Sequence, residues 1–358
     1  MFGNAKRLYF TLLITLFLSG YTFDFGYAFQ GTQDESEIKI FNLNESSFFN
    51  LSDSYYNESW IYSFSLNDSI QMTYSFNVSE IGTFKNRVTG AKMLLSFNEN
   101  DRFELSKEYS LNSFEFNNDS IFIKLHPERS FWVTAQQNGS QTIRLETRKN
   151  DVNYNIEFEL FNMAESVRWK EGLFEIGSEN FFMELLVPHA QVKGYISVND
   201  DSVQVKGTAS MIHTYLTGKS NKLLDEGIRY TILDYNSAND YLISYLLKTK
   251  KNNWIGYGIS KEEDKISVLI PEELSILSEK KLRGVKVIES AEIKYHYNEI
   301  HSLKVEKILD HYSYLDELNG FSKMLVKSFL GSEIVEFQAM GTLNDSKQIS
   351  FENFFTKN

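Results

Sequence analysis

The sequence predicts an all-β protein built from two sheet domains in series. Aromatic residues make up 15% of the 358 residues, and there are only three prolines. Short runs in which apolar and polar residues alternate recur along most of the chain, as in half-buried strands rich in aromatic residues. The chain is longer than one ordinary domain, so two separate cores are expected.

The first 28 residues predict an export signal. Basic residues precede an apolar run, residues 8–18, and small residues follow up to Ala28. A membrane-spanning helix needs about 20 apolar residues, and Asp24 interrupts any extension of this run. We therefore expect cleavage near Ala28 rather than an uncleaved anchor, and a periplasmic or extracellular location.

Residues 29–56 are polar, acidic and poorly patterned, which predicts an extended lead-in. Strands begin after it, within a first domain at residues 57–219. Trp60, Tyr62 and Phe64 share one face of the first run, and a second alternating run at residues 70–78 completes a hairpin.

A later hairpin of the first domain ends in the stretch VQVKGTASMIHTYLTG, residues 203–218. By alternation, Met211, His213 and Tyr215 lie on the face that begins with Val203, and this face should point inward. An imidazole and a phenol on an inward face predict the wall of a hollow. The alternative is a histidine satisfied within a solid core.

The second domain, residues 220–358, repeats the strand pattern. Residues 271–284 begin with a proline, carry acidic residues early and basic residues late, and end in glycine, which predicts one short helix. Residues 314–331 are a second helix candidate. Many consecutive strands favour closed barrels or sandwiches, because these bury one sheet face and protect the edges.

Several function classes are disfavoured by composition. A net charge of −12 repels phosphate backbones and anionic lipids, so no nucleic acid is expected as a partner, and membrane contact should be no more than transient. The absence of cysteine excludes disulfides, thiolate metal sites and a cysteine nucleophile. His296 and His301, five positions apart on a strand, would face opposite sides, and no nucleotide or hydrolase motif is present. We predict no cofactor and no metal.

The stretches ESWIYSFSL, GLFEIG, AQVKGYISVNDDSVQVKGTASMIHTYLTG and DYLISYLLKTKKNNWIGYGIS resemble the succession in the survival factor 1-like proteins and their relatives, the carotenoid 1,2-hydratase (hydroxyneurosporene synthase) group. The resemblance covers nearly all of the chain after the signal. It implies two tandem lipocalin-like antiparallel β-barrels with one or two short helices. For survival factor 1-like proteins it implies handling of apolar lipids and a link to oxidative stress.

Two departures from the family pattern concern the site. His213 matches the histidine that the hydratase group places beside an aspartate and two residues before a tryptophan, but Ile212 and Tyr215 stand at those two positions. Hydration of an unactivated alkene needs a strong proton donor. The missing carboxyl therefore argues against enzymatic activity.

The main hypothesis is an exported protein that binds a hydrophobic lipid or isoprenoid, with a site formed by Trp60, Tyr62, Met211, His213 and Tyr215. The alternative is an isoprenoid hydratase or cyclase that uses His213 and Tyr215 with Asp234. A third hypothesis treats both barrels as solid, in a structural or surface-interaction module.

Overall fold

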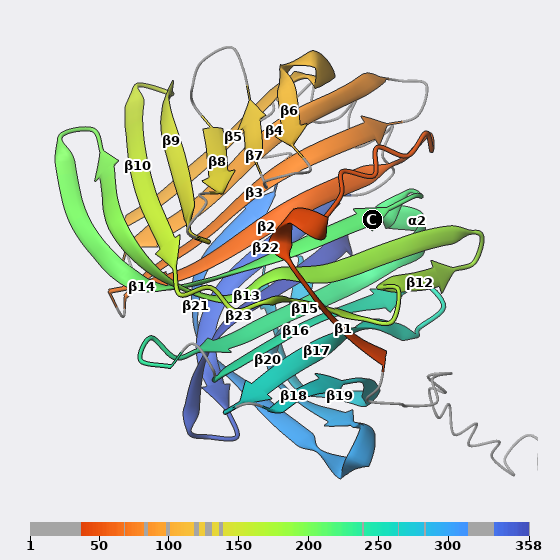
Figure 1. Cartoon of the computed structure of the whole chain (residues 1–358). Coiled ribbons are helices and arrows are strands. Elements are labelled where there is room, and N and C mark those ends of the chain that lie inside the picture. Colours follow the sequence, from red (N-terminus) through yellow and green to blue (C-terminus); the bar gives the residue numbers. More distant parts are fainter. Residues whose placement is uncertain are drawn as a thin grey trace, which may run out of the picture.

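The computed structural model describes residues 37–67, 69–81, 85–97, 101–117, 122–125, 131–135, 139–237, 240–263, 265–282, 284–313 and 333–357. The described strands form two curled antiparallel sheets, and the sheet of β2–β14 lies above that of β15–β23 in Figure 1. This confirms the all-β prediction. The predicted export signal and the helix candidate at residues 314–331 lie outside the described residues. No helix in the described part of the chain is long and apolar enough to cross a membrane.

The first sheet has the strand order β5-β4-β3-β2-β14-β13-β10-β9-β8-β7-β6, with β1, β11 and β12 attached on the side of β13. Because β2 pairs with β14, two strands that lie far apart in the sequence are neighbours in this sheet. Its strands are β1 (Ile38–Phe41), β2 (Asn57–Leu66), β3 (Ile70–Ile81), β4 (Lys85–Phe97), β5 (Asp101–Ser110), β6 (Phe114–Asn117), β7 (Phe122–Leu125), β8 (Phe131–Ala135), β9 (Gln141–Lys149), β10 (Val152–Phe161), β11 (Ser166–Trp169), β12 (Leu173–Ile176), β13 (Glu179–Val198) and β14 (Asp201–Leu216).

The second sheet has the order β18-β17-β16-β15-β23-β22-β21-β20-β19. Its strands are β15 (Leu224–Leu233), β16 (Tyr241–Thr249), β17 (Trp254–Glu262), β18 (Lys265–Leu269), β19 (Pro271–Leu282), β20 (Val285–Tyr295), β21 (Ile300–Ser313), β22 (Glu333–Leu343) and β23 (Lys347–Lys357). The described helices are one α-helical turn, α2 (Ser220–Leu223), and the 3₁₀ turns η2 (Leu43–Glu45), η4 (Leu111–Ser113) and η5 (His296–Asn298).

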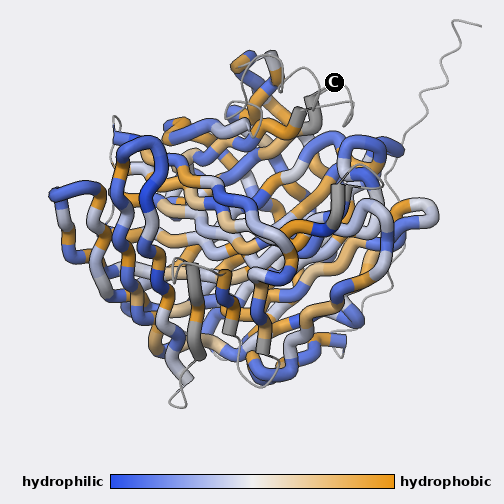
Figure 2. Tube along the Cα trace, turned by 90° about the horizontal axis from the view of Figure 1, so that it is seen from above, coloured by the Kyte–Doolittle hydropathy of each residue, from blue (hydrophilic) through white to orange (hydrophobic). Residues whose placement is uncertain are grey.

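Strand β14 is buried on both faces over its second half, residues 208–216. Ala209 and Met211 belong to the core enclosed by the first sheet. Ile212, on the opposite face, packs in a cluster that also holds Ile243 and Tyr257 of the second sheet. On this face of β14 the residues change from polar to apolar at Ile212, and this change marks where one sheet packs on the other. In Figure 2, strands carry orange apolar stretches, while many turns at the rim are blue.

Strand β13 changes partners along its length. Its first half pairs with β12 and β11, and its second half pairs with β10. Its pairing with β14 is irregular on either side of Val187, next to Pro188 and His189. A proline removes a ladder donor, and such irregularities bend a strand. This bend lets one long strand serve two parts of the first sheet.

The predicted helix at residues 271–284 is wrong. Residues Pro271–Leu282 form β19, which pairs with β20 through a register interrupted three times. Proline is tolerated at the first position of an edge strand. Leu274 pairs with Ile293, and both belong to an apolar cluster formed by strands of the second sheet. Tertiary pairing outweighs the helix-like charge order, since each charged end signal contributes only about 0.3–1 kcal/mol.

Candidate functional site

Three adjacent strands bring a histidine and two glutamates together in the first sheet. His213 on β14 lies directly opposite Glu184 on β13. On the other side, β14 pairs with β2 so that Tyr215 lies opposite Glu58. This places Glu58 diagonally across from His213, and diagonal neighbours are within reach of long side chains.

Both ring nitrogens of His213 contact a carboxylate. Nδ1 lies 2.9 Å from Glu184 Oε1, and Nε2 lies 2.8 Å from Glu58 Oε1. His213 and Glu58 are fully buried, and Glu184 is almost so. Because carboxylates can only accept hydrogen bonds, two such contacts suit an imidazolium that donates from both nitrogens.

The pKa of His213 is raised from 6.5 to about 9. Burial by itself lowers the pKa, because it disfavours the charged ring. The hydrogen bonds to Glu184 and Glu58 and the attraction of their charges outweigh this effect. His213 is therefore protonated at neutral pH.

Each carboxylate has further donors. Glu58 accepts hydrogen bonds from the Tyr56 hydroxyl and from the backbone N–H groups of Phe49 (3.1 Å) and Asn50 (3.4 Å). Burial and the neighbouring Glu58 charge raise the pKa of Tyr56, which stays a phenol donor. Buried charges need such paired, hydrogen-bonded surroundings.

Glu184 is held in the same way. It accepts from the Ser46 hydroxyl at 3.1 Å, and its second oxygen lies 3.2 Å from Arg168 Nη1. The four formal charges of Glu58, His213, Glu184 and Arg168 sum to zero, so the buried cluster is electrically balanced.

Aromatic rings surround His213. Trp60 stacks on the imidazole at 4.8 Å with 6° between the planes, and Phe49 lies on it at 5.7 Å and 25°. Phe182 meets the ring edge-on at 5.8 Å and itself stacks on Tyr215 at 5.0 Å. The imidazolium is thus enclosed by electron-rich ring faces, which favour a cation.

The structure brings together three of the residues predicted for the site, Trp60, His213 and Tyr215. Tyr62 and Met211 lie opposite each other two pairs further along β2 and β14, within the core. The Tyr62 hydroxyl donates to Gln141 at 3.1 Å. Asp234 does not reach His213. Its backbone oxygen contacts His189 Nε2 at 2.8 Å instead.

Sequence reasoning missed both glutamates. Glu58 continues the inward face of Trp60 and Tyr62 by one step, so alternation alone was sufficient to find it. Glu184 carries no such signal, because residues 181–190 of β13 are buried on both faces and the sequence does not reveal the register with β14. The absence of an aspartate at Ile212 is therefore no argument against a catalytic site. The residue next to His213 on a strand faces away from it, and Glu58 and Glu184 supply carboxyl groups from the neighbouring strands.

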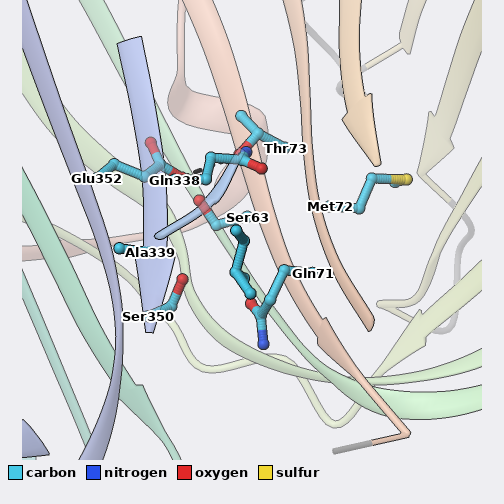
Figure 3. Close-up of a pocket in the computed structure, with 9 residues that line it drawn as sticks. Ser63, Gln71, Met72, Thr73, Gln338, Ala339, Ser350 and Glu352 are labelled. Atoms are coloured by element: carbon cyan, nitrogen blue, oxygen red, sulfur yellow. Dashed lines mark hydrogen bonds between the residues drawn. The ribbon is translucent and has the colours of Figure 1, made fainter. Parts of the chain in front are cut away.

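A small pocket between the two sheets is a weaker candidate. Ser63 and Thr73 of the first sheet meet Gln338 and Glu352 of the second across it, as Figure 3 shows. Thr73 Oγ1 donates to Glu352 at 2.9 Å and accepts from Gln338. The space measures about 200 Å³ with its open mouth, below the ~300–1,000 Å³ of small-molecule pockets. We therefore assign it to the packing of the two sheets.

His296 and His301, which were considered as metal ligands, contact different groups. His296 is paired with Glu272, whereas His301 contacts the Tyr230 hydroxyl and Glu299. Among the described residues, no group of three or more His, Asp or Glu side chains is arranged to hold a metal ion.

Solved structures share this architecture. A protein described as an AttH (NE1406) from Nitrosomonas europaea aligns with 83% of this chain and 91% of its own, at 11% identity and a TM-score of 0.61. This chain has a lipocalin-like fold. Kievitone hydratase from Nectria haematococca aligns with 91% of this chain and 96% of its own, at 12% identity and TM-score 0.52.

CghA, solved with Sch210972, gives 8% identity and a TM-score of 0.55 over 85% of this chain and 89% of its own. No family model and no curated protein sequence matches the chain. One of these neighbours, kievitone hydratase, is a hydratase by name, which agrees with that part of the sequence resemblance. They bear on the fold, and the survival factor 1 resemblance stays a prediction.

Proposed function

We propose that this protein is an enzyme of the hydratase or cyclase type that acts on an apolar, unsaturated small molecule. The observation that carries the proposal is the buried imidazolium of His213 between the carboxylates of Glu58 and Glu184. The structural neighbours favour this alternative over simple lipid carrying.

The cluster suits proton transfer to carbon. A ring proton of His213 can pass to Glu58 or Glu184, and the carboxylic acid that forms is the stronger donor that a C=C bond needs, while the neutral ring can take a proton back. Protonation of a C=C bond leaves a carbocation, which the faces of Trp60 and Tyr215 can stabilise. In a hydratase, water then attacks the cation and loses a proton to a carboxylate. In a cyclase, a second C=C bond attacks instead, and the new carbocation then loses a proton to a carboxylate.

The setting of this reaction follows from the N-terminal sequence and the charge. We expect export to the periplasm or outside the cell, an apolar isoprenoid or lipid as the partner, and action without a cofactor. The link to stress survival that the sequence resemblance implies belongs to this proposal as well.

The test is product analysis with geraniol, geranylgeraniol and lycopene in detergent micelles prepared in H₂¹⁸O. A hydratase product carries the mass of one heavy water, and a cyclase product has the substrate mass with a new retention time. Glu58→Gln and His213→Gln should lose about 10²-fold or more in rate. Glu292→Gln, at an exposed position of the second sheet, is the matched control and should keep full activity.

Binding without turnover is the second candidate. Its supporting observation is that both nitrogens of His213 and both glutamates are already satisfied within the protein, as in a structural ion cluster. Mass spectrometry of the native protein decides between the two. A co-purifying apolar molecule that is never converted, with no turnover of the three probes, would refute the enzyme proposal and support the carrier.

A further inference from the structure

A segment that precedes β2 lies over the imidazole of His213. We call residues 42–56 the strap. The strap residue Phe49 lies on the His213 ring and also contacts Phe182 at 4.8 Å and Tyr215 at 4.9 Å. A substrate that approaches His213 from this side must therefore take the place of Phe49.

The neighbouring strap residue, Phe48, inserts beside Trp60. Its ring lies 5.9 Å from Trp60 and contacts Phe114 at 5.2 Å and Phe116 at 6.1 Å. Phe48 and Phe49 are each only part-buried. They fill an aromatic-lined space beside a buried charge cluster, where an apolar ligand would otherwise gain burial.

The strap is fixed at its ends and is held in the middle by Glu58 and by Arg87 of β4, whose guanidinium donates to Asn50 Oδ1 and to the Leu51 carbonyl. Before it, β1 pairs with β11, and after it the chain enters β2. Residues 47–52 form no backbone–backbone hydrogen bond within the described part of the chain. Glu58 instead binds the N–H groups of Phe49 and Asn50, and Asn50 adopts the left-handed conformation with φ 46°. Such a segment opens without disturbing a sheet.

Trp60 supplies an independent sign of a missing partner. Its indole nitrogen is buried and has no hydrogen-bond partner among the described residues. A buried N–H without an acceptor is costly, and such groups are rare in native proteins. An oxygen atom of a ligand beside Trp60 would satisfy it.

We infer that Phe48 and Phe49 occupy a ligand subsite, and that the natural ligand is a flat apolar molecule with a hydroxyl group that displaces them. When the strap opens, Glu58 loses two N–H donors. A carboxylate accepts only, so the ligand must donate in their place, and a hydroxyl does so while its oxygen is available to Trp60. This inference deepens the proposed function and rests on it, since it defines the substrate class of the same site.

The test uses 2-naphthol and 2-methoxynaphthalene, two flat fluorescent probes that differ in the hydroxyl donor. Phe49→Ala should bind 2-naphthol about tenfold more tightly than the wild type, because no side chain has to be displaced. The wild type should prefer 2-naphthol over the methoxy probe by about tenfold, because the strap opens for either probe and only the hydroxyl replaces a donor to Glu58. Phe174→Ala, which truncates a part-buried ring in another cluster, is the control and should bind like the wild type.

The inference is overturned if the folded Phe49→Ala binds no better than the wild type, if Phe174→Ala gains as much, or if the two probes bind equally. Hydrogen exchange of the wild type provides a measurement that needs no variant. Saturating 2-naphthol should speed amide exchange at Phe49 and Asn50, and unchanged exchange with the probe bound at the site contradicts displacement. Because the chain has no cysteine, thiol labelling of Phe49→Cys can report the same opening.

The two proposals fail separately. Tight, hydroxyl-dependent binding with no turnover of any isoprenoid probe keeps the subsite and removes the proposed chemistry. Turnover that depends on His213, with the strap protected throughout, keeps the chemistry and removes the subsite.

Discussion

The pH dependence of stability is the sharpest test of the His213 cluster. The pKa of His213 rises from 6.5 to about 9 on folding. A raised pKa stabilises the fold fully below pH 6.5, and this contribution is lost as the pH rises through about 9. At 1.36 kcal/mol per pH unit, the cluster contributes about 3 kcal/mol near pH 6 that is absent above pH 10.

His213→Gln removes the titrating group while it keeps one hydrogen-bond donor. At pH 6 the variant should be about 3–5 kcal/mol less stable than the wild type, because two buried carboxylates lose a positive partner. The difference should shrink by about 3 kcal/mol between pH 6 and pH 10, since the wild type loses its proton over that interval.

Urea unfolding at pH 6, 7, 8, 9 and 10 measures the free energy of unfolding of both proteins, and the difference between them cancels the other titrating groups. Nitrogen-15 NMR of the ring reports protonation directly and should show two protonated nitrogens in His213 at pH 8. A constant difference across this range, or a neutral ring at pH 7.5, would refute the reasoning about the carboxylate pair.

Two further predictions concern groups outside the cluster. Burial raises the pKa of Glu226 to about 7, so ionisation of this carboxyl lowers the stability of the fold progressively from pH 4.5 to 7. Glu226→Gln keeps the acceptor for Asn353. This variant should have a higher melting temperature than the wild type at pH 8 and nearly the same one at pH 4.5. Equal shifts at both pH values would contradict this sign. Thr73→Val removes the hydroxyl that joins Glu352 and Gln338 across the two sheets and should cost about 1–3 kcal/mol in urea unfolding; a neutral effect would show that this contact is not needed where the sheets pack.

The sequence alone was sufficient for most of the strands and for one wall of the site, although β19 was predicted as a helix. Alternation along residues 203–215 gives the face of Met211, His213 and Tyr215, because a strand places every second side chain on one side. The same rule gives the face of Trp60 and Tyr62. These predictions depend only on the local backbone period, which the chain carries without reference to any partner.

The tertiary structure decided what those faces meet. Pairing registers between β2, β14 and β13 bring Glu58 and Glu184 to His213, and register depends on contacts between residues 29 and 155 positions apart. The strap shows the same limit: residues 42–56 have no strand period, yet their backbone binds Glu58 and their rings cover His213. Local pattern predicts which way a side chain points, whereas only the folded chain determines the charge and the ring that lie opposite it.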